Sequence, residues 1–271
     1  NRFSIVVKNG GAIGTTYVLV QRRPDGSLGP EGFLIKAHAT GRGQRHDSDS
    51  IGELVGAELA HNLGLPMLPG RGDGKIKLRG GGQGVAIVTE HAFNSPQGGA
   101  DFRTDVRGFN LGNLPAGEQA LGARLENLMV NWLLGVGDRH SGNGMLGVSP
   151  NGDVAAIPID LAWVGRANSQ RIKNYSFGMD NQLLRQIRDA GSADPAVRQA
   201  IEAQIRLMIG RFNAIASDQD KRNALFKGGV YADKLVGDGG YVKSQLNSHW
   251  NTMAPNGSID VERVITDIFG A

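Results

Sequence analysis

The stretch GDRHSGNGMLGVSPNGDVAAIPIDLAW, residues 137–163, places polar side chains on both sides of an apolar hairpin pattern. Asn151-Gly152 is a two-residue turn signal, because a type I′ turn needs positive φ at both central positions. If these residues form the loop, Asn143 lies opposite Asp160 at a Cα spacing of roughly 4.5–5.5 Å. A bulge at Pro158 would shift that register by one residue. The pattern therefore predicts an amide and a carboxylate side by side at the base of a hairpin.

The residue types in this stretch suit one kind of chemistry. An amide oxygen beside a carboxylate is a hard, oxygen-only ligand pair, which fits a Mg²⁺ ion that also binds phosphate oxygens. Asp138 precedes this pair and, as a carboxylate, can accept the proton of a hydroxyl group. A base beside a metal pair suits phosphoryl transfer, where catalysis is positioning and charge neutralisation. The alternative is a salt-bridged turn of Asp138, Arg139 and His140 after a helix.

Composition excludes several other classes of protein. The 271 residues, 40% hydrophobic and 20% charged, are typical of a globular chain that forms one large domain or two lobes sharing a cleft. A net charge of +3 without a Lys/Arg block argues against nucleic-acid binding. The absence of cysteine excludes disulfides and thiolate metal sites. With no secretory signal or membrane-spanning run, we expect a cytoplasmic protein without a stable membrane anchor, or a domain excised from a larger protein because the sequence starts at Asn1.

The first part of the chain has the pattern of strands joined by glycine turns, with Pro24–Gly26 as one of the turns. A single helix from about Ile51 to Leu63 is expected, with HDSDS offering N-cap residues and Gly64–Pro66 ending it. The expected strands are Phe3–Lys8, Tyr17–Gln21, Gly32–His38, Lys75–Leu78 and Val85–Thr89. The sequence therefore predicts a small antiparallel sheet with one helix.

From about Pro115 the periodicity becomes helical and leads straight into the loop at residues 135–140. Asp194-Pro195 begins a further helix, with proline in its first turn. Its apolar stripe consists of Val197, Ile201, Ile205, Met208 and Phe212. A short helix is expected near Val261–Phe269. The fold class is therefore α+β, with a sheet-rich N-terminal lobe over residues 1–93 and a mostly helical C-terminal lobe over residues 94–271.

Triphosphate binding needs a cation and a backbone cradle. Lys36 lies in the apolar stretch FLIKAH, where a lysine normally has a charged partner; the alternative is an edge-strand lysine that protects the sheet from aggregation. The loop NGGAIGTT, Asn9–Thr16, can cover phosphates with its backbone N–H groups, although glycine hairpins are also common without a ligand.

Glu53 is the natural counter-ion for Lys36, with Glu58 as the alternative. Ser50 and Glu53 also fit a capping box, in which the glutamate reaches back to the start of the helix. The backbone of Glu90, His91 and Ala92 is placed to bond an adenine edge between the lobes.

In this order the motifs resemble the phosphatidylinositol 3-/4-kinase-like branch of the kinase superfamily, which includes HipA-type serine/threonine kinases. GDRHSGN followed by IPIDLAW is similar to its catalytic loop and metal-binding aspartate. ELVGAELAHNLGLPMLP is similar to its helix C, and GGAIGTTYVLV and FLIKAH match its phosphate loop and nucleotide lysine more loosely. The likeness covers about Ile5 to Val164 and implies a two-lobed kinase-like fold that binds ATP with Mg²⁺ or Mn²⁺.

The resemblance also implies a role for each matching residue. Asp138 would be the catalytic base, with His140 supporting its loop and Lys36 contacting phosphate while steadied by Glu53. Asn143 and Asp160 would be the metal ligands. The phosphate loop would consist of Gly10, Gly11, Ala12, Ile13, Gly14, Thr15 and Thr16. One departure is that Leu161-Ala162-Trp163 follow the metal aspartate in place of Phe-Gly.

The segment after Asp160 is expected to face the phosphate acceptor. Its cationic residues, with a tyrosine and a serine behind them, predict a basic loop that binds an inositol phosphate headgroup or an acidic protein segment, or else a solvated charge run. These residues are Arg166, Arg171, Lys173, Tyr175 and Ser176. A protein serine or threonine is favoured as acceptor because no basic amphipathic helix is present. The alternatives are a phosphoinositide kinase, a pseudokinase that serves as a nucleotide-binding interaction module, and AMP transfer on the same fold; the oligomeric state stays open.

Overall fold

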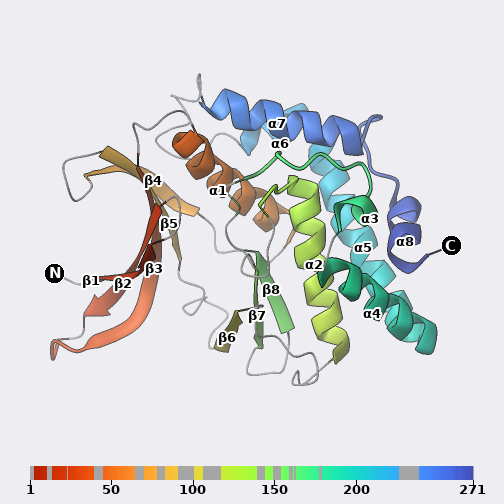
Figure 1. The fold of residues 1–271 in the computed structure, drawn as a ribbon, viewed down its shortest axis with the longest axis horizontal. Helices are drawn as coiled ribbons and strands as arrows, with labels where there is room; N and C mark the ends of the chain where they lie inside the picture. The colour runs from red at the N-terminus through yellow and green to blue at the C-terminus, as the bar shows by residue number, and fades with distance from the viewer. Residues whose placement is uncertain are drawn as a thin grey trace.

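The computed structural model describes the backbone of most secondary-structure elements and the side chains of most of the helical part. Figure 1 shows a curved antiparallel sheet on one side of the molecule and a group of helices on the other, with a smaller sheet between them. The described residues are 3–10, 14–22, 24–39, 45–64, 70–77, 83–90, 101–105, 117–138, 144–148, 154–158, 161, 163–176, 179–225 and 238–270. For the strands this description concerns the backbone.

The larger sheet has five strands in the order β1-β2-β3-β5-β4, all antiparallel. Each predicted strand is present, and most are longer than expected. Their bounds are β1 Phe3–Gly10, β2 Gly14–Arg22, β3 Leu28–Ala39, β4 Gly70–Lys77 and β5 Gln83–Glu90. The turn predicted at Pro24–Gly26 is confirmed: Gly26 has φ +82°, and Ser27 N–H and Oγ–H donate to Asp25 Oδ1 at 2.9 and 2.6 Å.

A second, three-stranded sheet has the order β6-β7-β8. Its strands are β6 Asp101–Asp105, which was not predicted, β7 Gly144–Val148 and β8 Val154–Pro158. The hairpin of β7 and β8 is confirmed, but its predicted register is wrong. A two-residue loop at Asn151-Gly152 would set Gly144 opposite Ile159, whereas Gly144 lies opposite Pro158 and Val148 opposite Val154.

The described pair nearest the turn is Val148 opposite Val154, one residue away from the pairing of Val148 with Ala155 that the predicted two-residue loop requires. The described ladder keeps one register from end to end, so the offset is already present before any bulge at Pro158. Asn143 and Asp160 lie just beyond this ladder, outside the described residues. Their predicted pairing directly across the hairpin does not follow from the register found.

Helix α1 runs from Arg45 to Asn62 and begins six residues before the predicted start at Ile51. HDSDS therefore forms the first turns of the helix, where acidic side chains are favourable near the N-terminus. Ser50 is inside the helix and is not its N-cap, so the capping-box explanation of Glu53 is wrong. The predicted end is confirmed, because Gly64 has φ +83° and donates its N–H to His61 O at 2.9 Å.

Helix α2, Gly117–Leu134, confirms the helix predicted before the polar loop. The start of α5 is also as predicted: Asp194 is the N-cap and accepts from Ala196 N–H at 2.8 Å, with Pro195 in the first turn. All five residues of the predicted α5 stripe are buried, and α8 has the predicted bounds. The remaining helices are α3 Ile172–Tyr175, α4 Met179–Ala193, α5 Pro195–Ala216, α6 Gln219–Ala224, α7 Asp238–Met253 and α8 Val261–Phe269.

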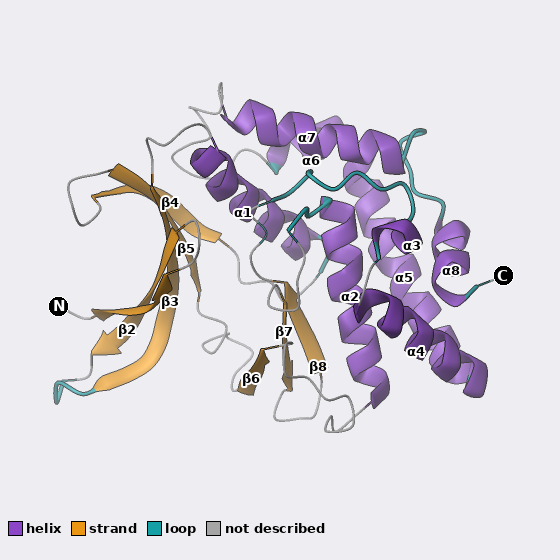
Figure 2. Ribbon diagram, viewed as in Figure 1, coloured by secondary structure: helices purple, strands orange, loops and turns teal. Residues whose placement is uncertain are grey.

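The described apolar core lies among the helices, and Trp132, Trp250 and Phe212 are its largest fully buried side chains. Phe212 and Trp250 meet edge to face with their centroids 5.4 Å apart. Helix α1 joins the two parts of the molecule, because it contacts β3, β4 and β5 on one side and α2 and α7 on the other (Figure 2). The predicted lobe boundary at residues 93 and 94 lies outside the described residues. None of the helices in the described ranges combines the length and apolarity that a bilayer crossing requires.

Candidate active site

The C-terminal end of α2 is held by partners from distant parts of the chain. A helix leaves its last four carbonyl groups without intrahelical partners, and here each of the four accepts a hydrogen bond from outside the helix. Tyr175 Oη–H donates to Asn131 O at 2.7 Å, and the imidazole Nε2 of His249 bonds Trp132 O at 2.6 Å. The indole Nε1–H of Trp250 donates to Leu133 O at 2.9 Å, and Gly165 N–H donates to Leu134 O at 2.8 Å.

The loop after α2 is joined to residues 163–167 by backbone hydrogen bonds. Besides the Gly165 bond, Ala167 N–H donates to Gly135 O at 2.8 Å and Gly137 N–H donates to Trp163 O at 2.9 Å. Gly135 has φ +60°, and a Cβ there would meet Ala167 O and His249 Cδ2 at 2.7 Å. A side chain larger than hydrogen is therefore excluded at Gly135. Asp138, which is exposed, follows this loop directly and so lies beside the segment that comes after Asp160.

Leu161, the residue after Asp160, packs against helix α1. It is fully buried, and a Cβ placed on Gly56 would lie 2.7 Å from Leu161 Cβ, so the absence of a side chain at Gly56 permits the contact. Glu53 precedes Gly56 by three residues, which puts both on neighbouring positions of one helix face. Glu53 is half-buried. The described residues therefore bring together α1, the loop of Asp138 and the segment that follows Asp160.

The larger sheet brings two other predicted features together. Lys36 lies on β3, opposite Thr16 of the predicted phosphate loop on β2 and opposite Ile87 on β5. β3 is the middle strand of five, so the interpretation of Lys36 as an edge-strand lysine is wrong. The glycine-rich loop is a hairpin connection in which Gly10 lies opposite Thr15. Gly14 and Thr15 lie in β2, and Glu90 ends β5.

The alternative partner for Lys36 is not supported. Glu58 is exposed, and its carboxylate Oε1 accepts from Asn62 Nδ2 on the next turn of the same helix at 3.2 Å. Several predicted site residues lie outside the described residues, and their roles stay predictions. These are Gly11, Ala12, Ile13, His91, Ala92, Arg139, His140, Asn143 and Asp160. Within the described residues, no group of three or more histidine or acidic side chains is arranged to hold a metal ion.

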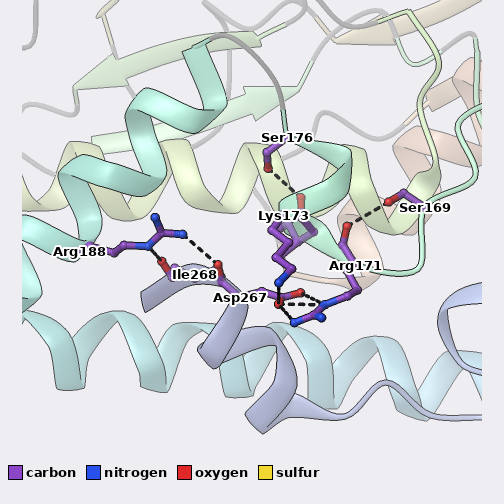
Figure 3. A network of polar contacts seen from close by, with 8 residues as sticks. Ser169, Arg171, Lys173, Ser176, Arg188, Asp267 and Ile268 are labelled. Atoms are coloured by element: carbon purple, nitrogen blue, oxygen red, sulfur yellow. Dashed lines mark hydrogen bonds and ion pairs between the residues drawn. The ribbon is translucent and has the colours of Figure 1, made fainter. Parts of the chain in front are cut away.

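In the basic acceptor loop predicted after Asp160, two of the three cations are turned toward an internal carboxylate (Figure 3). Arg171 Nε donates to both oxygens of Asp267 at 3.0 Å, its Nη2 also bonds Oδ1, and Lys173 Nζ is 3.8 Å from Oδ1. The Asp267 side chain is only 2% exposed and needs such partners. Ser176 is buried and donates through Oγ to Ile172 O at 2.8 Å, while Tyr175 is buried against the end of α2.

The third cation of that segment has a different surrounding. The Arg166 guanidinium lies over the ring of Trp163, 4.6 Å from its centroid, in a cation–π contact. A Cβ on Gly137 would lie 2.9 Å from Arg166 Cβ, so this side chain begins beside the loop of Asp138. Arg166 is therefore the cation of the predicted basic loop that lies nearest to Asp138 along these contacts.

Two side chains in this scaffold, His249 and Arg171, have shifted pKa values. Burial lowers the pKa of His249, and the hydrogen bond to Trp132 O offsets part of that effect. Its other ring nitrogen, Nδ1, is buried without a hydrogen-bond partner among the described residues. The neutral ring that donates through Nε2 is therefore the favoured form. The hydrogen bond with Asp267 raises the pKa of the Arg171 guanidinium.

The residues that hold this scaffold were not among the predicted site residues. His249, Trp250 and Asp267 lie far from residues 137–163 in the sequence, and Tyr175 was predicted to face the acceptor. One signal was available: Asp267 lies three residues after Val264 on the apolar side of its helix, where a carboxylate needs a cationic partner. No comparable local pattern relates His249 or Trp250 to the end of α2.

No protein-family model matches the chain, and no curated protein does so either. The solved structures similar to it include the Helicobacter pylori proinflammatory kinase CtkA, which is 11% identical, with 98% of this chain and 94% of that chain covered and a TM-score of 0.48. MAP kinase LmaMPK10 from Leishmania major is 14% identical, with 100% and 83% covered and a TM-score of 0.33. The pseudokinase domain of BIR2, an immune regulator of the RLK/Pelle family, is 13% identical, with 97% and 79% covered and a TM-score of 0.33.

Proposed function

We propose that the protein is an ATP- and Mg²⁺-dependent phosphotransferase that moves the γ-phosphate to a hydroxyl group of a protein serine or threonine. One observation carries the proposal. The loop ending at Asp138 is hydrogen-bonded to residues 163–167, and Leu161 packs on α1 one turn after Glu53. A base, the approach to a metal-binding aspartate and a helix glutamate thus belong to one connected scaffold.

The nucleotide would lie between residues 1–93 and residues 94–271. Lys36 on the middle strand of the sheet would contact phosphate oxygens, and Glu53 on the adjoining helix would hold its ammonium group. The position of Thr16 opposite Lys36 supports this, because the phosphate loop and the lysine are then neighbours across two strands. The backbone of residues 90–92, at the end of β5, would bond the adenine edge.

The metal would be held by Asn143 and Asp160. The fit rests on two features: the donors are oxygen atoms, as Mg²⁺ prefers, and both residues flank the same end of the hairpin, where Gly144 lies opposite Pro158. When bound, the ion would neutralise charge on the phosphate oxygens. Asp138 would orient the acceptor hydroxyl and take its proton as the phosphate is transferred.

A protein acceptor is favoured over a phosphoinositide. Arg171 and Lys173, two of the three cations predicted to bind an inositol phosphate headgroup, are directed to Asp267 instead. Tyr175 and Ser176 are buried, so these side chains are also occupied within the fold. With fewer cations for a polyphosphate headgroup, the segment fits an uncharged hydroxyl side chain better.

The test is transfer of labelled γ-phosphate from ATP to the protein itself and to a mixture of serine- and threonine-containing peptides. Asp138→Ala is expected to lower kcat by about 10²–10⁴-fold, the usual contribution of a general base. Asp220→Asn, an exposed aspartate on α6, is the matched control and should leave the rate unchanged. Lys36→Met should abolish transfer through loss of the phosphate contact.

The other outcomes distinguish the alternatives. Equal transfer by wild type and Asp138→Ala would remove Asp138 as the base. A product carrying AMP, read from its mass, would replace phosphoryl transfer by nucleotidyl transfer. Nucleotide binding in a calorimetric titration without any turnover would identify a pseudokinase, and phosphorylation of phosphoinositide vesicles alone would identify a lipid kinase.

A further inference from the structure

The last helix of the chain is fastened to the segment that follows Asp160. Arg171, just before α3, forms its two-pronged bond with Asp267 of α8, and Arg188 of α4 donates to Ile268 O at 2.6 Å and to Asp267 O at 3.1 Å (Figure 3). Arg188 therefore holds the end of α8 through the backbone carbonyl groups of Asp267 and Ile268, and the Asp267 carboxylate pairs with Arg171 and, at 3.8 Å, with Lys173. The interaction is directional because guanidinium and carboxylate are both planar.

From Asp267 a continuous set of contacts leads to the loop of Asp138. The carbonyl of Arg171 accepts from Ser169 Oγ at 3.0 Å and from Tyr175 N–H at 3.1 Å. The next bonds reach α2, because Ser169 O accepts from Trp132 Nε1 at 3.0 Å and Tyr175 Oη bonds Asn131 O and Val136 O. Val136 is two residues before Asp138. The hydrogen bonds are joined to one another by the covalent structure of Arg171, Ser169 and Tyr175, and Val136 leads to Asp138 along the backbone.

We propose that Asp267 is a positioning residue for the phosphoryl transfer: its carboxylate fixes Arg171, and through Arg171 it fixes both residues 163–176 and the Asp138 loop. The inference rests on the proposed function. Under this inference α8 contributes to the geometry of the active site, although no residue of α8 belongs to the predicted site. Asp267 itself contacts neither substrate nor metal, so its effect is exerted entirely through the geometry of Asp138.

The different burial of the two partners makes the Asp267 carboxylate the better residue to substitute. The Asp267 side chain is 2% exposed, whereas Arg171 is 34% exposed and has access to water. Replacing Asp267 by Asn removes the buried charge and leaves Arg171 able to hydrate, so the fold survives better than if the carboxylate lost its partner. Asp267→Asn therefore tests whether Asp267 positions the Asp138 loop, and it should do so with limited loss of stability.

The experiment compares Asp267→Asn with Glu262→Gln. Glu262 is also on α8 and pairs with an arginine, Arg206 of α5, but this pair is exposed and does not touch residues 163–176. Asp267→Asn is expected to lower kcat about tenfold with an unchanged KM for ATP, because the phosphate loop and Lys36 are untouched. Glu262→Gln should keep the wild-type kcat, as expected for a surface pair.

Amide hydrogen exchange provides a readout that does not need activity. In Asp267→Asn, exchange at residues 134–138 and 163–176 should accelerate while α5 keeps its protection; uniform acceleration would mean general destabilisation and would overturn the inference. Arg171→Lys keeps the charge without the two-pronged geometry and should be intermediate. The double variant Arg171→Gln/Asp267→Asn should lower kcat by no more than whichever single substitution lowers it further, because both remove the same interaction.

The two hypotheses fail in different ways. If wild type transfers phosphate and Asp267→Asn keeps both its kcat and its exchange pattern, the positioning role is wrong and the proposed function stands. If wild type transfers no phosphate, the proposed function is wrong and a catalytic role for Asp267 falls with it; the exchange data then decide whether Asp267 still orders the loop.

Discussion

The ends of α2 and α5 show two ways to finish a helix. At α2, Gly135 and Val136 donate locally to Trp132 O and Asn131 O, both at 3.0 Å. Each of the last four carbonyls also accepts from a distant residue, namely Gly165, Tyr175, His249 or Trp250, up to 117 residues away. At α5 the backbone bonds are local, with Ser217 N–H donating to Asn213 O at 3.0 Å and Asp218 N–H to Ile215 O at 3.2 Å. Asp218 then caps the following helix by accepting from Asp220 N–H at 2.9 Å.

The two kinds of helix end differ in how strongly the rest of the fold determines the position of the loop that follows. A local ending needs only its own few residues, and it tolerates changes elsewhere in the chain. An ending assembled from distant partners is specified by the whole fold, which fixes the direction of the loop that follows it. The α2 end carries Asp138, so its position depends on α3, α7 and residues 163–167 together.

The largest expected effect is the loss of Trp250. Trp250→Ala removes a buried ring and the donor to Leu133 O, and should lower the free energy of unfolding by about 3–5 kcal/mol. Leu207→Ala on α5, where the side chain is 54% exposed, should change it by no more than about 0.5 kcal/mol. Urea titrations followed by circular dichroism measure both. Equal losses would contradict the distinction between the two regions.

A second pair of variants separates crowding from backbone strain. Gly135→Ala and Gly257→Ala both place a side chain at positive φ, which costs roughly 1–2 kcal/mol in each case. A Cβ at Gly257 meets nothing within 4 Å, whereas one at Gly135 collides with Ala167 O and His249. Gly135→Ala should therefore be worse by about 1–3 kcal/mol in thermal or urea unfolding. If both variants lose the same stability, the α2 end is looser than described.

The third prediction concerns pH. Because burial lowers the pKa of His249, the unfolded chain takes up this proton at about pH 6.5 and the folded chain only at lower pH. Stability is then fully present above that pH and is lost as the pH falls below it. His249→Gln should reduce the difference in unfolding free energy between pH 7.5 and pH 5.5, while His61→Gln on the exposed side of α1 should preserve it. An unchanged pH dependence in His249→Gln would show that the imidazole does not oppose folding in acid.

The smallest expected effect is a glycine-to-alanine change that stabilises the fold on α5 and destabilises it on α1. Gly210→Ala on α5 adds a Cβ with nothing within 4 Å and should raise the free energy of unfolding by about 0.5–1 kcal/mol through helix propensity. Gly56→Ala on α1 makes the same change where the Cβ would press on Leu161, so it should be destabilising. Differential scanning calorimetry of the two variants gives the signs directly. Stabilisation by both would mean that α1 and Leu161 are not in close contact.

The elements predicted best are those with local signals. Asp194-Pro195 identifies the start of α5 because capping and proline geometry involve adjacent residues only. The residues Val261–Phe269 also form a helix with the expected bounds. Helices α4 and α7 were not predicted although Leu183 and Ile187 of α4 have helical spacing and are buried. That signal was present and was missed.

The backbone positions of some candidate site residues agree with the sequence prediction. The position of Lys36 on an interior strand opposite Thr16 agrees with its predicted partner loop, and the helix of Glu53 packs on that sheet. The predicted hairpin register was wrong: a two-residue loop at Asn151-Gly152 would set Val148 opposite Ala155, whereas Val148 lies opposite Val154. The contacts of Arg171 and Lys173 within the fold were not predicted because their partner, Asp267, is 96 residues from Arg171. Sequence spacing carries no information on such a pair.

Backbone hydrogen exchange at Gly137, Gly165 and Ala167 tests the central claim most directly, because these three amides join the Asp138 loop to the segment after Asp160. Measured by NMR in the wild-type protein, they should exchange as slowly as the buried amides of α5. Exchange as fast as that of exposed Ser27 in the β2–β3 turn would mean that the loop and the segment are separate, and the proposed site would lose its scaffold.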